Sequence, residues 1–86
     1  MPNDLELAKT LGLLAYSHGD YARSMSALRQ CTEKSTNDAE IFFDLGMDYY
    51  KLNQPKDSKP ALEHALALGV ADNMAVQGRT VLKELK

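Results

Sequence analysis

The chain has 86 residues, 44% of them hydrophobic and 26% charged, with a formal net charge of −2 and a pI near 5.6. A chain of this length forms one small domain, and its mixed charges offer no basic face for the phosphates of a nucleic acid. The one local group of basic residues, Arg79, Lys83 and Lys86, suits the C-terminal end of a helix, where cations oppose the helix dipole. We therefore expect no nucleic-acid partner.

Cysteine content and hydropathy indicate the compartment. Cys31 is the single cysteine, so no disulfide can form within the chain. Small domains in oxidising compartments often depend on disulfides for stability. No charged leader precedes an apolar run, and no stretch approaches the ~18 apolar residues that a membrane span requires. These features favour a cytoplasmic protein without a membrane partner.

Polar turns divide the chain up to Leu68 into four segments in which apolar residues recur at helical spacing. Asn3 followed by Glu6 forms a capping-box pattern, and Gly19 and Asn53 suit the left-handed residue that ends a helix. The short turns, one with Asp20 as the next cap, predict antiparallel neighbours. The expected helices span residues 4–17, 21–34, 38–52 and 55–68, with a linker at 35–38.

The fourth expected helix contains a local conflict between its two prolines. Pro55 suits the first turn of a helix, but Pro60 lies where a backbone N–H donor is normally needed. The helix is therefore expected either to start late, near Asp57, or to bend at Pro60.

Apolar residues of the last segment, 72–86, recur at the spacing of a fifth helix. They follow the pattern i, i+4, i+7, i+8 and i+11, which places them on one face. If the apolar pattern of the preceding segments continued unchanged, Arg79 and Lys83 would lie at positions that pack against other helices. The last segment therefore follows a different apolar pattern. We predict a closing helix that covers the last pair of helices with Met74, Gly78, Val81, Leu82 and Leu85.

The sequence aligns with itself at an offset of 34 residues. Residues 5–38 align with residues 39–72 without a gap, and the identical pairs fall at helical spacings. The chain therefore contains two copies of one two-helix unit. The identical pairs include Leu11 with Leu45, Gly12 with Gly46, and Leu28 with Leu62.

One motif recurs in both units. The second unit reads Phe42-x2-Leu45-Gly46-x2-Tyr49, followed by Ser58-x3-Leu62 and Ala65. The first unit is a looser copy and reads Ala8-x2-Leu11-Gly12-x2-Ala15, followed by Ser24-x3-Leu28 and Cys31. This pattern resembles the tetratricopeptide repeat (TPR) family. The proline that usually closes a unit of that family is replaced by Thr36 in one copy and by Val70 in the other.

The resemblance implies an all-α fold of antiparallel helical hairpins, stacked as a short right-handed α-solenoid of five helices. It implies a single domain over residues 1–86. The first repeat would span 5–38, the second 39–72, and the capping helix 73–86.

The two repeated glycines have a physical explanation. Gly12 and Gly46 lie inside expected helices, where glycine costs roughly 1 kcal/mol relative to alanine. Their repetition indicates that a neighbouring helix passes too close for a β-carbon. We expect the bulky residues Leu11, Leu45 and Phe42 to fill the space around this contact.

In the TPR family, the first helix of each hairpin lines a concave groove that receives an extended peptide or a partner helix. The resemblance implies that the same face binds a partner here, through a strip that is apolar and partly aromatic. Phe43, Met47 and Tyr50 would anchor the partner, and flanking charges would set its register. Alternatively, the closing helix or further repeats cover the strip. The implied groove residues are Glu6, Lys9, Leu13, Tyr16, Glu40, Phe43, Asp44, Met47, Tyr50 and Lys51.

Residues that could carry chemistry each have a structural explanation. His18 and His64 are far apart in sequence and lack the spacing of a metal site. Cys31 falls at a small packing position, which favours a buried core residue over a nucleophile. Asp44 and Asp48 lie one helical turn apart and are expected to be solvated or to face the groove. We therefore expect no enzyme, metal, cofactor or small-molecule substrate.

These features favour an adaptor that docks a peptide or amphipathic helix of another protein. TPR proteins that bind acidic chaperone tails use a set of basic and amide side chains of which only Lys9 is present here, so that ligand is not expected. Two alternatives remain open. The chain could self-associate as a homo-oligomer through the same apolar face, or it could be a regulatory segment of a larger protein.

Overall fold

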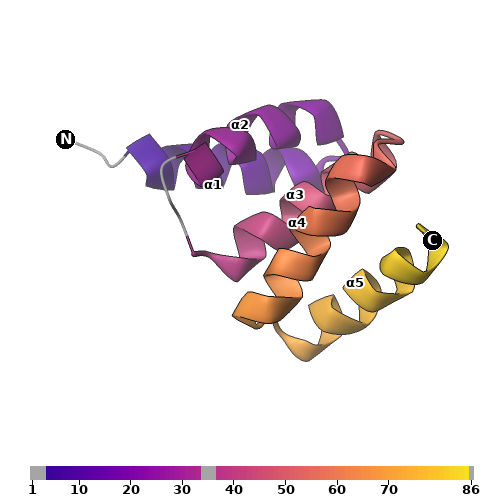
Figure 1. The fold of residues 1–86 in the computed structure, drawn as a ribbon. Helices are drawn as coiled ribbons and strands as arrows, with labels where there is room; N and C mark the ends of the chain where they lie inside the picture. Colours follow the sequence, from indigo (N-terminus) through magenta and orange to yellow (C-terminus); the bar gives the residue numbers. More distant parts are fainter. Residues whose placement is uncertain (1–3, 34–36, 86) are drawn as a thin grey trace.

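In the computed structural model, residues 4–33 and 37–85 are described, and their regular structure is entirely helical. Five helices follow one another in these residues (Figure 1). Each begins and ends within two residues of its predicted bounds, wherever those bounds fall on described residues. The helices are α1 (Asp4–Ser17), α2 (Tyr21–Glu33), α3 (Ala39–Lys51), α4 (Pro55–Leu68) and α5 (Asp72–Glu84).

Left-handed residues end the first helix of each hairpin. Gly19, which follows α1, has a φ of 79°, and Asn53, which follows α3, has a φ of 61°. Glycine and asparagine adopt this backbone conformation more readily than other residues do. The chain can therefore reverse direction within a few residues, and this prediction is confirmed.

Aspartates cap the helices that follow the turns. The Asp20 carboxylate accepts a hydrogen bond from the Arg23 backbone N–H at 3.3 Å, and the Asp38 carboxylate accepts one from the Glu40 backbone N–H at 3.0 Å. Each bond satisfies a donor that a helix start would otherwise leave without a partner. The capping box predicted at Asn3 lies outside the described residues, as does part of the linker predicted at 35–38.

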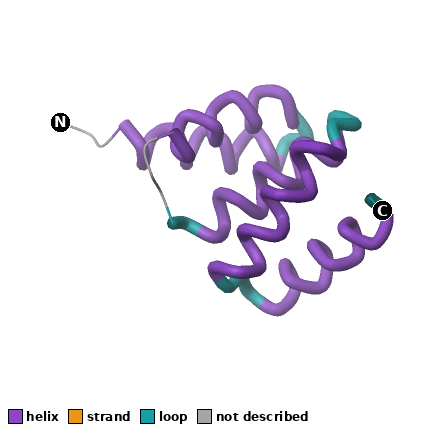
Figure 2. Tube along the Cα trace, in the orientation of Figure 1, coloured by secondary structure: helices purple, strands orange, loops and turns teal. Residues whose placement is uncertain are grey.

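The helices form two antiparallel hairpins, and α5 lies against the second one. Figure 2 shows a short loop between the two helices of each hairpin. Each helix packs against the next along the chain, and α3 contacts α1, α2, α4 and α5. The described part of the chain is therefore an all-α domain with sequential helix packing, and α3 is its central element.

Each hairpin is held by a close contact at its glycine. A β-carbon at Gly12 would lie 2.6 Å from Leu28 Cδ2, and one at Gly46 would lie 2.6 Å from Leu62 Cγ. Carbon atoms that are not bonded do not approach so closely, so a β-carbon at either position would force the leucine to shift. The Ser58 hydroxyl also donates a hydrogen bond of 2.8 Å to the Gly46 carbonyl oxygen. The predicted close approach is confirmed in both hairpins.

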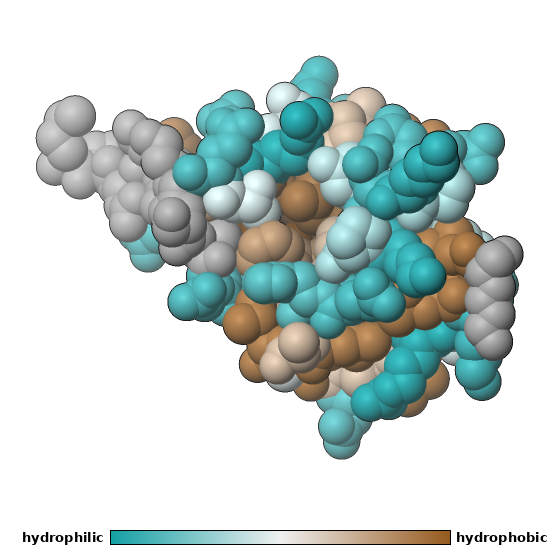
Figure 3. Space-filling view, viewed as in Figure 1, coloured by the Kyte–Doolittle hydropathy of each residue, from teal (hydrophilic) through white to brown (hydrophobic). Residues whose placement is uncertain are grey.

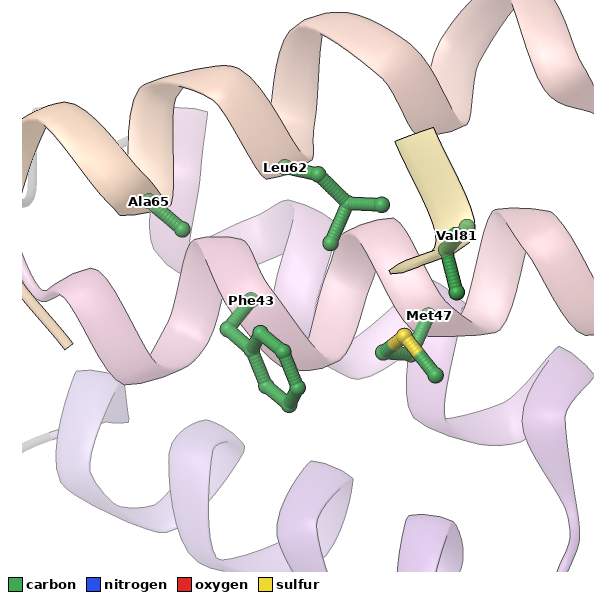
Figure 4. Packing of buried hydrophobic residues seen from close by; sticks show 5 residues of the cluster. All are labelled: Phe43, Met47, Leu62, Ala65 and Val81. Atoms are coloured by element: carbon green, nitrogen blue, oxygen red, sulfur yellow. The ribbon is translucent and has the colours of Figure 1, made fainter. Parts of the chain in front are cut away.

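Two groups of buried side chains meet at α3. The first joins α2 to α3 through Leu28, Cys31, Ile41 and Leu45. The second joins α3, α4 and α5, and Figure 4 shows its five buried members. They are Phe43 and Met47 of α3, Leu62 and Ala65 of α4, and Val81 of α5.

The proline conflict in α4 is resolved without a late start. The helix begins at Pro55, in the first turn that favours proline, and continues through Pro60 to Leu68. Pro60 is exposed, so its ring lies toward solvent. Of the two expected alternatives, the late start near Asp57 is therefore wrong, and the expected range of 55–68 is confirmed.

The closing helix packs through the predicted face. Gly78 and Val81 are buried, and Met74, Leu82 and Leu85 pack against the second group of core residues. On the face drawn in Figure 3, apolar surface follows the seam between α4 and α5. Among residues 4–33 and 37–85, no helix is long and apolar enough to cross a membrane.

Candidate protein-interaction surface

The predicted groove begins on α1 with a lysine that the structure ties to α3. The Lys9 ammonium pairs with Asp38 at 2.5 Å and with Glu40 at 3.4 Å. The hydrogen bond to Asp38 and the nearby charges raise the pKa of Lys9, so that it stays protonated. Because Asp38 also caps α3, this ion pair connects the first turn of α3 to α1.

Two of the three predicted anchors are buried. Phe43 is 3% exposed and Met47 is 7% exposed, and Val81 of α5 belongs to the same buried group. A β-carbon at Gly78 would lie 3.7 Å from the Phe43 ring, so α5 passes directly over this side chain. The strip is therefore not open at these two positions, because α5 covers it.

The other predicted groove residues surround this covered centre. Tyr16 is half-buried and packs against the same group of core residues. Tyr50, the third anchor, is half-buried and donates a hydrogen bond from its hydroxyl to the carboxylate of Glu84 at the end of α5. Leu13 is half-buried and Lys51 is exposed. Tyr50 thus helps to hold the helix that covers Phe43 and Met47.

Asp44 and Asp48 of α3 are buried, contrary to the expectation that they face solvent or an open groove. Burial raises the pKa of each carboxyl to about 7, and the charge of Asp44 adds to the rise at Asp48. The nearby Ser24 hydroxyl lowers the pKa of Asp48 but lies outside hydrogen-bond geometry. Both carboxyl oxygens of Asp48 lack a hydrogen-bond partner among the described residues. Below neutral pH, both carboxyls are therefore mostly protonated.

A row of exposed leucines lies on another face of α1. Leu7, Leu11 and Leu14 follow the spacing i, i+4, i+7, and their exposed fractions are 52%, 52% and 53%. We call these three residues the leucine row. The expectation that Leu11 packs around the contact at Gly12 is wrong, because Leu28 fills that space and Leu11 points outward. The spacing of the three leucines is the sequence signal that could have identified this face.

A shallow groove of about 440 Å³ runs beside the leucine row, between α1 and α2. Leu11, Leu14 and Ala27 line it with apolar surface. Asp20 and Arg23 form part of its rim and pair with each other at 3.4 Å. An apolar centre with a polar rim is the usual anatomy of a protein-binding surface.

The residues considered for chemistry lie apart in the structure. Exposed His64 packs against Phe42 with ring centres 4.2 Å apart and the two rings tilted by 55°, whereas exposed His18 lies in the first turn. Cys31 is buried, and burial raises the pKa of its thiol. In the part of the chain that the structure describes, no three His, Cys, Asp or Glu side chains are grouped to hold a metal ion.

Comparison with known proteins assigns no family to this chain. No family model matches it, and no curated protein matches it. Its function is therefore inferred from its own packing and from its exposed surfaces.

Proposed function

We propose that this chain is a protein–protein interaction adaptor that binds a peptide or helix of another protein. It is built as a short TPR-like α-solenoid of two hairpins and a capping helix, and it works by binding, without catalysis, in the cytoplasm. The 34-residue repeat supports this architecture, as do the matching contacts of Gly12 with Leu28 and of Gly46 with Leu62.

The leucine row is the observation that carries the proposal. Its three half-exposed side chains lie on successive turns of one helix, where side chains three and four residues apart are neighbours. The other large apolar side chains that are exposed among the described residues, Leu68 and Val76, lie on different helices. Continuous apolar patches on small proteins usually mark an interaction site. Covering the exposed half of each leucine would contribute about 1 kcal/mol to binding.

The covered groove is a weaker candidate for the same function. Phe43 and Met47 contact a partner only if α5 first leaves its place, and this exposes apolar surface at a cost in free energy. The leucine row requires no such rearrangement. We therefore place the binding surface on α1.

Affinity purification of the tagged full chain tests this assignment. Leu11→Glu places a charge in the leucine row, and Val76→Glu is the matched control because Val76 is 60% exposed on α5. We expect proteins that co-purify with the wild-type chain to be retained by Val76→Glu and reduced about tenfold or more by Leu11→Glu. Circular dichroism confirms that both variants remain folded. Partners that bind all three chains equally would contradict the assignment to α1.

Self-association is the second explanation of the leucine row. In an antiparallel pair of α1 helices, Leu7 of one copy would face Leu14 of the other, so the row is complementary to itself. Light scattering across about a hundredfold range of concentration separates the two explanations, because mass action favours a dimer as concentration rises. A dimer that Leu11→Glu converts to a folded monomer would favour self-association.

A further inference from the structure

The leucine row occupies positions that are buried in the second hairpin. At the 34-residue offset, Leu7 corresponds to Ile41 and Leu11 corresponds to Leu45. Ile41 and Leu45 are each 4% exposed, whereas Leu7 and Leu11 are each 52% exposed. The same face of the first helix is therefore covered on α3 and open on α1.

The helix that covers this face of α3 is α2. Leu28 and Cys31 are buried in one group with Ile41 and Leu45, and Met25 packs against that group. Met25, Leu28 and Cys31 recur every three residues, and we call them the α2 seam. A helix that presents such a seam fits the exposed face of the first helix of a hairpin.

The two hairpins match closely enough for this comparison. Leu28 approaches Gly12 as closely as Leu62 approaches Gly46, since a β-carbon at either glycine would lie 2.6 Å from the leucine. The first helix of each unit therefore has the same relation to its own second helix. Its outer face is also equivalent in the two units.

We propose that the leucine row docks an amphipathic helix of a partner protein, and that this helix presents an apolar seam like that of α2. The inference rests on the proposed function and names the kind of partner that the same surface accepts. It explains why large apolar side chains stand exposed at positions where the second unit buries Ile41 and Leu45.

One position distinguishes the partner helix from α2. Leu14 of the leucine row corresponds to Asp48, and the Ser24 hydroxyl of α2 lies near the Asp48 carboxyl. A helix docked on α1 meets a leucine there in place of a carboxyl. A hydroxyl buried against leucine loses its hydrogen bonds to water, whereas a methyl group gains apolar contact. The partner therefore carries an apolar residue at the position equivalent to Ser24.

A second folded copy of the chain does not offer this seam. Leu28 and Cys31 are buried within their own copy, and Met25 is half-buried against α3. A second copy could contribute only its own leucine row, which has a different spacing. The α2 seam is the arrangement that covers the equivalent face of α3, so a second folded copy does not supply the helix that this proposal expects.

A synthetic peptide with the sequence of residues 20–33 serves as the probe for the full chain. A side-chain bridge between positions 22 and 26, both exposed in α2, holds it helical, because a free helix of this length is marginal in water. Ser24→Ala and Leu28→Asp are the peptide variants. Fluorescence anisotropy measures binding to the wild-type chain, to Leu11→Glu and to the matched control Val76→Glu.

The proposal predicts saturable binding with one peptide per chain. The Ser24→Ala peptide should bind about threefold to tenfold more tightly than the unsubstituted peptide, because it replaces a buried hydroxyl with a methyl group. The Leu28→Asp peptide should not bind. Leu11→Glu in the chain should weaken binding about tenfold or more, whereas Val76→Glu should leave it unchanged.

Three results would overturn the proposal. Absence of binding up to about 1 mM peptide would show that the row does not accept this seam. Equal binding to Leu11→Glu would show that the peptide replaces α2 in its own site. A dimer that Leu11→Glu dissociates would assign the row to a second copy. If the peptide fails to bind while Leu11→Glu still loses its co-purifying partners, the proposed function stands and only this inference fails.

Discussion

Substitutions of single glycines by alanine test the close packing of the helices. Gly46→Ala would place a β-carbon 2.6 Å from Leu62 Cγ and 3.1 Å from the Leu62 backbone nitrogen, so we expect it to lose about 1–3 kcal/mol of stability. At Gly78, the nearest atom would lie 3.7 Å away, which is an ordinary contact. Gly78→Ala is the matched control, and its better helix propensity should leave stability unchanged or raise it by up to about 1 kcal/mol. Urea unfolding measures both, and similar losses in the two variants would contradict the described contacts.

The two buried carboxyls predict that stability falls as pH rises toward neutrality. Burial raises the pKa of Asp44 and Asp48 to about 7, whereas in the unfolded chain they ionise near the ordinary value of 3.8. Between these values, the folded chain binds more protons than the unfolded chain does. The free energy of unfolding should therefore decrease from about pH 4 to about pH 7, by up to about 1.4 kcal/mol per pH unit for each group. Above that range it should level off.

Calorimetry at pH 4.5 and pH 7.5 checks this dependence. The wild-type Tm should be higher at the lower pH, and Asp48→Asn should reduce the difference by about half, because only one buried carboxyl then remains. The ion pair of Lys9 with Asp38 does not contribute to the difference in Tm between these two pH values. Burial alone would raise the pKa of Asp38, but Lys9 lowers it overall, so that this pair weakens only below the range tested. A wild-type Tm that rises with pH would contradict the burial of the two carboxyls.

The sequence predicts the glycine contacts correctly, but it does not predict the exposure of Leu11 or the burial of Phe43 and Met47. A glycine inside a helix has a local cost, so its repetition at Gly12 and Gly46 indicates a contact without knowledge of the rest of the fold. The exposure of Leu11 and the burial of Phe43 depend on which neighbours cover α1 and α3. Which helices cover α1 and α3 depends on the tertiary packing, and the local sequence around Leu11 or Phe43 does not determine it.

At the scale of elements, the helices were predictable because local chemistry marks their ends. Gly19 and Asn53 provide the left-handed residues after α1 and α3, and Asp20 and Asp38 provide the caps. The start of α4 followed the local preference of Pro55, and Pro60 was accommodated on the exposed side. Helix bounds therefore agree with expectation more closely than the assignment of faces does.

The composition of α3 explains why α5 covers Phe43 and Met47. Ile41, Phe43, Leu45 and Met47 are all buried, so this helix is apolar around much of its circumference. A helix of that kind is usually enclosed by neighbours, which is a sequence signal against an open groove. The phase of the closing helix was predicted correctly, but its position over Phe43 could not be read from that phase alone.

At the scale of the whole molecule, α3 connects all the other helices, while α1 and α5 lie at opposite ends of the packing order. The two ends differ. At one end, the outer face of α1 carries the leucine row. At the other, α5 turns its apolar face inward and leaves Val76 as its one large apolar side chain more than half exposed among the described residues. The apolar surface of α1 is therefore more exposed than that of α5.

In this structure, α5 covers Phe43 and Met47 of α3, whereas the leucine row of α1 remains open. The most direct test is to compare the free energies of unfolding of Phe43→Ala and Leu11→Ala in urea. We expect a loss of about 3–5 kcal/mol for Phe43→Ala, because it leaves a cavity beneath α5, and a change within about 1 kcal/mol for Leu11→Ala. A small loss for Phe43→Ala together with a large loss for Leu11→Ala would contradict it, because Phe43 would then be exposed and the leucine row buried.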